Sequence, residues 1–157
     1  RKPCVVMSPK SLLRHPKVVS PLAEFTSGRF REVLPDTTVD PKKVKRVVLC
    51  TGKVYFDLEE AREKEKIANV ALVRLEQLHP LPKTQLLEVL KSYKGAEVVW
   101  VQEEPENMGY WNYLLRLLYQ ELPMRVIARK PSASPATGYN KVHVEEQRNL
   151  VAQALSL

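Results

Sequence analysis

The sequence predicts an α/β fold, with a mainly parallel sheet covered by helices on both faces. From about residue 44 onward, strand-length apolar runs alternate with stretches whose apolar residues recur at helical spacing. The central runs are apolar throughout, as in strands that are buried on both faces. A length of 157 residues, with 44% hydrophobic and 27% charged residues, suits one compact domain.

Four strands are predicted, at residues 47–50, 70–75, 98–101 and 124–128. Each is followed by a helix that has an apolar stripe along one face. The clearest stripe is formed by Trp111, Leu114, Leu115, Leu118 and Leu122. Because strand–helix–strand connections are almost always right-handed, this rhythm leaves few topologies for the sheet.

The first 43 residues differ from the rest of the chain. Proline recurs there at a density that breaks long helices and central strands, so we expect residues 1–43 to form an ordered arm. Within the arm, residues 3–7 are predicted to be a short strand and residues 10–14 a single helical turn. Residues 44–157 are predicted to form the α/β domain.

Composition narrows the class of protein. The net charge is +7, but its clusters contain no aromatic side chains on which bases could stack, so no nucleic-acid partner is predicted. No apolar run approaches the roughly 20 residues that a membrane helix needs, so no membrane partner is predicted either. Cys4 and Cys50 lie in apolar runs and are expected to be buried and reduced. The chain begins without a methionine or a leader pattern, which indicates part of a longer polypeptide.

Polar residues follow the predicted strands, at the edge where parallel sheets bind their ligands. Thr51, Gly52 and Lys53 follow the first strand, Gln102 follows the third and Arg129 the fourth. A hydroxyl and an ammonium group at a helix N-terminus suit an anion, although a tight turn with a helix cap explains the same residues. The sequence predicts no catalytic residue and no metal ligand, because it contains no metal–diphosphate motif and no nucleophile elbow.

Five motifs resemble those of 2-oxoglutarate dehydrogenase decarboxylating subunits. They are SPKSLLRHP at 8–16, CTGKVY at 50–55, VRLEQL at 73–78, WVQEEP at 100–105, and SASPA at 132–136 with the later Val142-His143. They follow one another in the family's order and span nearly the whole chain. One departure is Lys130, because the family commonly has Gly-Arg-Pro before the SASPA loop.

The resemblance implies a transketolase-type C-terminal domain, a three-layer α/β/α sandwich with five strands, one of them antiparallel. The arm would then leave an upstream pyrimidine-binding domain. In such a subunit the upstream domains bind thiamine diphosphate and magnesium. The subunit forms a homodimer, decarboxylates 2-oxoglutarate and passes the succinyl group to the dihydrolipoyl succinyltransferase core. The resemblance implies a cytoplasmic location in bacteria or a mitochondrial-matrix location elsewhere, and a chain that is not catalytic alone.

An effector site is predicted on this domain. If the arm follows the family's path, two of its residues join the four on the sheet edge. The predicted set is Ser8, Lys10, Thr51, Lys53, Gln102 and Arg129. Such cations and hydroxyls suit a phosphate-bearing effector such as AMP or acetyl-CoA. In the alternative, the same groups pair with Glu76, Glu103 and Glu104.

Two other functions remain open from the residues. A 2-oxoadipate dehydrogenase shares all these motifs, because the substrate pocket would lie in the upstream domains. A free-standing nucleotide-binding or interaction module is the alternative from a different class.

Overall fold

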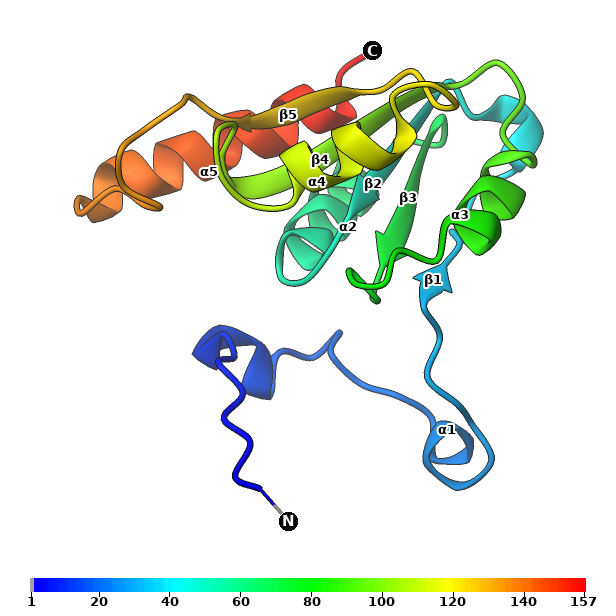
Figure 1. Cartoon of the computed structure of the whole chain (residues 1–157), viewed down its shortest axis with the longest axis horizontal. Coiled ribbons are helices and arrows are strands. Elements are labelled where there is room, and N and C mark those ends of the chain that lie inside the picture. Colours follow the sequence, from blue (N-terminus) through cyan, green and yellow to red (C-terminus); the bar gives the residue numbers. More distant parts are fainter. Residues whose placement is uncertain (1) are drawn as a thin grey trace. The chain divides into compact units, whose positions relative to one another are not determined.

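The computed structural model describes residues 2–157, which form two compact units divided between Phe30 and Arg31. Arg1, the first residue of the predicted arm, lies outside the described range. The larger unit, Arg31–Leu157, contains the whole sheet (Figure 1).

The sheet has five strands in the order β1-β3-β2-β4-β5. Their bounds are Val33–Leu34 for β1, Arg46–Cys50 for β2, Val70–Leu75 for β3, Glu97–Pro105 for β4 and Arg125–Arg129 for β5. Strands β3, β2, β4 and β5 run parallel, and β1 pairs with β3 in the antiparallel sense. The predicted fold class is therefore confirmed, including the single antiparallel strand.

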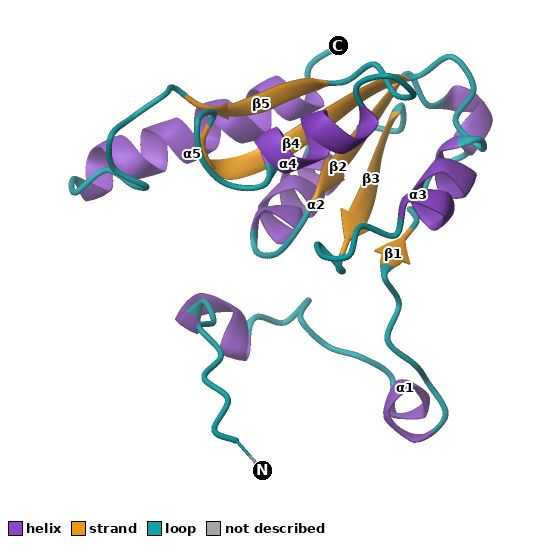
Figure 2. Ribbon diagram, in the orientation of Figure 1, coloured by secondary structure: helices purple, strands orange, loops and turns teal. Residues whose placement is uncertain are grey.

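Helices cover both faces of the sheet, as Figure 2 shows. Their bounds are Val54–Lys64 for α2, Lys83–Leu90 for α3, Trp111–Leu118 for α4 and Asn140–Leu155 for α5. Leu86 of α3 and Leu114 of α4 belong to one core cluster, whereas Leu58 of α2 and Leu150 of α5 belong to the other. Strands β2 and β3 contribute to both clusters, because their alternate side chains point to opposite faces. This is the reason for their continuous apolar sequence.

The short strand β1 is held to the sheet by a buried ion pair. Asp36, two residues beyond β1, accepts hydrogen bonds from the backbone N–H of Leu72 at 2.8 Å and from Arg62 of α2. Thr38 donates to the same carboxylate at 2.7 Å and accepts from Arg62 at 2.8 Å. Residues 31–43, which the sequence places in the arm, thus belong to the same compact unit as the sheet.

The smaller unit has little regular structure. It contains one 3₁₀ turn, η1 (Lys10–Arg14), as predicted, and a five-residue helix, α1 (Leu22–Thr26). Residues 3–7 were predicted to be a strand, but within residues 2–30 the structure has none. Cys4 is exposed, contrary to the prediction that both cysteines are buried. Both predictions depended on a pairing strand, which a single apolar run cannot supply for itself.

Strand β4 continues beyond its predicted end. The residues Gln102 to Pro105 were predicted to be a loop after the strand, whereas they are the last four residues of β4. The pairing of β4 with β5 shifts register between Val101 and Pro105, as in a β-bulge. Among residues 2–157, no helix combines the length and the apolar character that a bilayer span requires.

Candidate functional site

The carboxyl ends of β2 and β4 form the edge where the sequence places a ligand. The chain leaves β2 toward β3 on one side, and β4 lies on the other side of β2, so the strand order reverses here. After β2, Gly52 adopts a left-handed conformation with φ of 68°, which a glycine accepts without steric cost. This turn leads directly into α2 and positions the half-buried side chains of Thr51 and Lys53.

Lys53 forms ion pairs across this edge. Its Nζ lies 2.7 Å from a carboxylate oxygen of Glu103 on β4 and 3.0 Å from Asp57, one turn later on α2. Partial burial alone would lower the pKa of Lys53, but its hydrogen bonds to these two carboxylates outweigh burial and raise the pKa. Lys53 is therefore a charged ammonium group that already has two acidic partners.

Gln102 is buried inside the bulge of β4. Its Oε1 accepts hydrogen bonds from Trp100 Nε1 at 2.8 Å and from the backbone N–H of Trp111 at 3.0 Å. Its Nε2 donates to the carbonyl oxygens of Pro105 at 3.0 Å and Met108 at 2.7 Å. The amide thus holds the loop between β4 and α4 against the strand. Its hydrogen bonds are all made to groups of the domain itself.

Arg129, the last residue of β5, is buried to 9% exposure. Its Nη2 donates to Gln147 at 3.2 Å and lies 3.0 Å from His143 Nδ1, both on α5. Its Nε lies 3.6 Å from the carboxylate of Glu146, beyond hydrogen-bond range, and has no hydrogen-bond partner. Arg129 is therefore fixed against α5 while part of its donor capacity remains unused.

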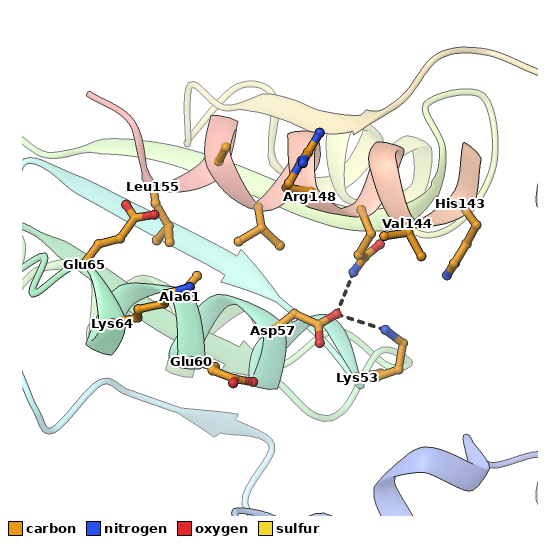
Figure 3. Close-up of a pocket in the computed structure, with 13 residues that line it drawn as sticks. Lys53, Asp57, Glu60, Ala61, Lys64, Glu65, His143, Val144, Arg148 and Leu155 are labelled. Atoms are coloured by element: carbon orange, nitrogen blue, oxygen red, sulfur yellow. Dashed lines mark hydrogen bonds and ion pairs between the residues drawn. The ribbon is translucent and has the colours of Figure 1, made fainter. Parts of the chain in front are cut away.

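A chain of polar contacts joins Lys53 to Arg129. Asp57 accepts a hydrogen bond from Lys53 and a second one, at 2.7 Å, from Nε2 of Gln147. The other amide atom of Gln147 accepts from Arg129. Figure 3 shows Asp57 with both of its partners, between α2 and α5. The structure thus brings Lys53 and Arg129 into one network, in which an acid and an amide separate the two cations.

A cleft of about 590 Å³ lies along this network, between α2 and α5. Its apolar side chains include Ala61 and Val151, and its rim carries charges of both signs (Figure 3). The rim residues are Lys53, Asp57, Glu60, Lys64, Glu65 and Arg148. Because the rim charges are mixed, this cleft has no strong preference for an anion.

Ser8 and Lys10, the remaining predicted site residues, belong to the smaller unit, where both side chains are exposed. Lys10 begins η1, and Ser8 lies two residues before it. Their approach to the sheet edge therefore stays a prediction.

The thiol of Cys50, a candidate nucleophile, is unsuited to catalysis here. Burial raises the pKa of Cys50 to about 12, which keeps its thiol protonated and unreactive. Among residues 2–157, no three His, Cys, Asp or Glu side chains gather as metal ligands.

Sequence reasoning missed two buried arginines. Arg46 lies in a basic stretch of the sequence, but it is 5% exposed and donates to Glu97 at 2.7 Å and to the carbonyl oxygens of Gln153 and Ala154 at the end of α5. Arg62 lies in a helical stretch of mixed charge, and it forms the buried ion pair with Asp36. Their acidic partners, Glu97 and Asp36, are 51 and 26 residues away in the sequence, a separation that local patterns do not reveal.

Known relatives match the whole chain, and a family model matches most of it. The family described as 2-oxoglutarate dehydrogenase C-terminal matches residues 19–155. The chain is 42% identical to oxoglutarate dehydrogenase of Buchnera aphidicola and 43% identical to the 2-oxoglutarate dehydrogenase E1 component of Azotobacter vinelandii. It is 44% identical to the mitochondrial 2-oxoglutarate dehydrogenase of Caenorhabditis elegans. Each match covers 100% of this chain but only 16–18% of the relative, so the chain spans about one sixth of their length.

Proposed function

The chain belongs to the 2-oxoglutarate dehydrogenase C-terminal family, and we propose that it is the carboxyl-terminal domain of a decarboxylating 2-oxoglutarate dehydrogenase subunit. The observation that carries the proposal is the identity of 42–44% along the entire chain to proteins of that name. The complete subunit would decarboxylate 2-oxoglutarate with thiamine diphosphate and magnesium, in the bacterial cytoplasm or the mitochondrial matrix. It would pass the succinyl group to the dihydrolipoyl succinyltransferase core.

Within that subunit, this chain has a structural and regulatory function and no catalytic one. Its buried thiol is protonated, Lys53 is paired with two carboxylates, and Gln102 is bonded within the domain. No nucleophile or base with an oriented partner emerges from these contacts. Thiamine diphosphate and magnesium therefore belong to the upstream domains.

The arm connects this domain to those upstream domains and helps to form the homodimer. Eight large apolar side chains in residues 2–30 are exposed over more than half of their surface, at 64–91%. They are Val5, Val6, Met7, Leu13, Val19, Leu22, Phe25 and Phe30. An apolar surface of this extent is typical of a protein contact. We assign residues 1–43 to this linking function and residues 44–157 to the domain, although the fold itself begins near Arg31.

The sheet edge binds an anionic effector such as AMP or acetyl-CoA. Lys53 and Arg129 supply the positive charge, and Thr51, two residues before Lys53, supplies a hydroxyl group. Gln102 supports the site from inside the bulge, because its amide is already bonded to five groups of the domain. The ion pair with Glu103 leaves Lys53 only partly available, which makes effector binding modest in strength.

The test of the whole proposal is enzymatic. The complete polypeptide, supplied with thiamine diphosphate and magnesium, should release carbon dioxide from 2-oxoglutarate faster than from 2-oxoadipate. The 157-residue chain alone should release none. Faster turnover of 2-oxoadipate would show that the protein is a 2-oxoadipate dehydrogenase instead. The absence of turnover with either acid would favour a free-standing binding module.

A further inference from the structure

The edge of the sheet opposite the candidate site, where the parallel strands begin, carries a group of exposed lysines. Lys42 and Lys43 belong to a 3₁₀ turn, η2 (Pro41–Lys43), Lys45 directly precedes β2, and Lys94 lies in the turn before β4. All four residues are exposed. Because β2 and β4 run parallel, the segments that lead into them meet at one edge of the sheet. These four residues are called the lysine patch below.

Backbone and core contacts hold the segments of the lysine patch together. The carbonyl oxygen of Lys45 accepts a hydrogen bond from the backbone N–H of Glu97 at 2.8 Å, which joins the beginning of β2 to the beginning of β4. Tyr93, next to Lys94, belongs to the same core cluster as Val44. In Figure 1 the η2 turn accordingly lies beside the loop that leads from α3 to β4. The fold itself therefore gathers lysines that are distant in the sequence.

The carboxylates around the lysine patch are paired with other cations. Glu97 accepts from Arg46 at 2.7 Å and from Arg125 at 2.6 Å. Glu88 is paired with Lys91 at 2.6 Å. Within residues 2–157, no ion pair engages any of the four lysines of the patch. Their charges are therefore balanced by solvent and not by the fold.

One acid, Asp40, belongs to the same surface. Its carboxylate accepts a hydrogen bond from the backbone N–H of Lys42 at 3.1 Å and caps η2. Four ammonium groups against this single carboxylate leave the surface positively charged. At the end of α2, by contrast, acidic and basic residues alternate over 63–66, so the charges there offset one another. A concentration of one sign attracts a partner of the opposite sign and raises its rate of association.

The surroundings of the lysine patch decide which kind of polyanion it suits. No large apolar side chain is exposed within residues 31–114, so the patch offers no anchor for a lipid bilayer. The ring of Tyr93 is 5% exposed and its hydroxyl donates to the Asp36 carbonyl, so it cannot stack on a nucleic-acid base. The patch contains lysines and no arginine, whose planar fork is the better fit to phosphate. These properties favour carboxylates, which are the anionic groups of proteins.

We propose that the lysine patch binds an acidic segment of a partner protein, in which glutamate and aspartate side chains face the four lysines. Each exposed ion pair contributes little, so the affinity comes from several pairs together. Because the charges are exposed, salt screens the interaction. The inference goes beyond the proposed function, since it requires neither decarboxylation nor an effector at the opposite edge of the sheet.

Charge reversal at two lysines tests the inference. Lys43→Glu with Lys94→Glu changes two exposed residues from separate segments and breaks no ion pair, so the fold should be kept. The matched control is Lys130→Glu with Lys141→Glu, which changes the net charge by the same amount at two other exposed lysines. Figure 1 shows the beginning of α5, where the control lies, at the far end of the domain from η2.

The experiment is fluorescence anisotropy of a labelled short polyglutamate peptide, titrated with the complete polypeptide. The peptide should bind, and more weakly as salt is raised. The patch variant should weaken binding about tenfold or more, a difference of about 1.4 kcal/mol. The control variant should weaken binding less than about twofold, because charges farther apart than about 8 Å are largely screened at physiological salt. Lys43→Gln with Lys94→Gln removes the two charges without adding repulsion and should weaken binding several-fold.

Three results would overturn the inference. The first is no binding of polyglutamate, and the second is an equal or larger loss in the control variant, which would show that net charge or another site binds the peptide. The third is tighter binding of duplex DNA or of anionic lipid vesicles than of polyglutamate at the same salt concentration, which would assign the patch to another class of partner. Thermal unfolding of each variant, compared with the wild type, shows that a loss of binding is not a loss of fold.

Discussion

Two buried arginines, Arg62 and Arg129, differ in how completely the protein satisfies them. Arg62 donates to the buried carboxylate of Asp36, to the Val70 carbonyl at 3.1 Å and to Thr38 at 2.8 Å. Arg129 donates to Gln147 on α5, and its Nε lies 3.6 Å from the partly exposed carboxylate of Glu146 with no hydrogen-bond acceptor. The first arginine is neutralised inside the fold. The second retains an attraction for an anion from outside, which is the difference between a structural ion pair and a binding site.

Removal of Arg62 should have the largest effect on stability. Arg62→Ala leaves Asp36 buried without its counter-charge, which typically costs about 3–5 kcal/mol. Urea denaturation of the 157-residue chain, followed by the fluorescence of the buried Trp100 and Trp111, measures the loss. Arg125→Ala is the control, because its ion pair with Glu97 is exposed and should contribute less than about 1 kcal/mol. Equal losses in the two variants would contradict the assignment of Arg62 as a structural residue.

A neutral buried side chain, Gln102, extends the comparison. Gln102→Leu leaves the indole N–H of Trp100, the backbone N–H of Trp111 and the Met108 carbonyl without partners, and should destabilise the chain by about 2–3 kcal/mol. Gly109→Ala should also destabilise it, since a Cβ there would lie 2.9 Å from the Gln102 amide and φ is 68°. If Gln102→Leu lost effector binding with unchanged stability, Gln102 would contact the ligand and our assignment would be wrong.

As the pH falls, the ion pair between Arg62 and Asp36 should weaken first. Burial alone would raise the pKa of Asp36, but hydrogen bonds from Leu72, Thr38 and Arg62 outweigh burial and lower the pKa below its ordinary value of 3.8. The unfolded chain therefore takes up the proton before the folded chain does. This stabilisation is complete above about pH 3.8 and is lost as the pH falls toward the lower folded pKa. The unfolding free energy of Asp36→Asn should fall less steeply in this window; parallel profiles would refute the prediction.

The parts of the molecule differ in how far the sequence predicts them. The parallel strands and their helices lie where apolar runs and helical stripes place them, because burial on both faces of the sheet leaves a direct trace in composition. Strand β1 leaves no such trace, since two residues cannot show a period. The polar sequence at the end of β4 predicts a loop. The buried position of Gln102 depends on hydrogen bonds to residues 105–111, which a strand pattern does not reveal.

The candidate site shows the same limit. Topology predicts that the loops after β2 and β5 meet, and the contacts from Lys53 through Asp57 and Gln147 to Arg129 agree with that expectation. The pairing of Lys53 with Glu103 was expected only as an alternative, and it is the arrangement found. Residue types and strand order bring charges to one edge, but whether they pair with each other or face a ligand depends on side-chain geometry.

Replacement of Arg129 should have a smaller effect on stability than replacement of Arg62 and a clear effect on binding. Arg129→Gln removes the hydrogen bonds to His143 and Gln147, at about 0.5–1.5 kcal/mol each, together with a long ion pair to a partly exposed carboxylate. It also removes a buried donor that lacks a partner, which offsets part of the loss. The variant should therefore unfold at a urea concentration much closer to wild type than Arg62→Ala does, while AMP affinity of the complete polypeptide falls about tenfold or more. A stability loss as large as that of Arg62→Ala would show that Arg129 is a second structural arginine, and the contrast between the two sites would no longer hold.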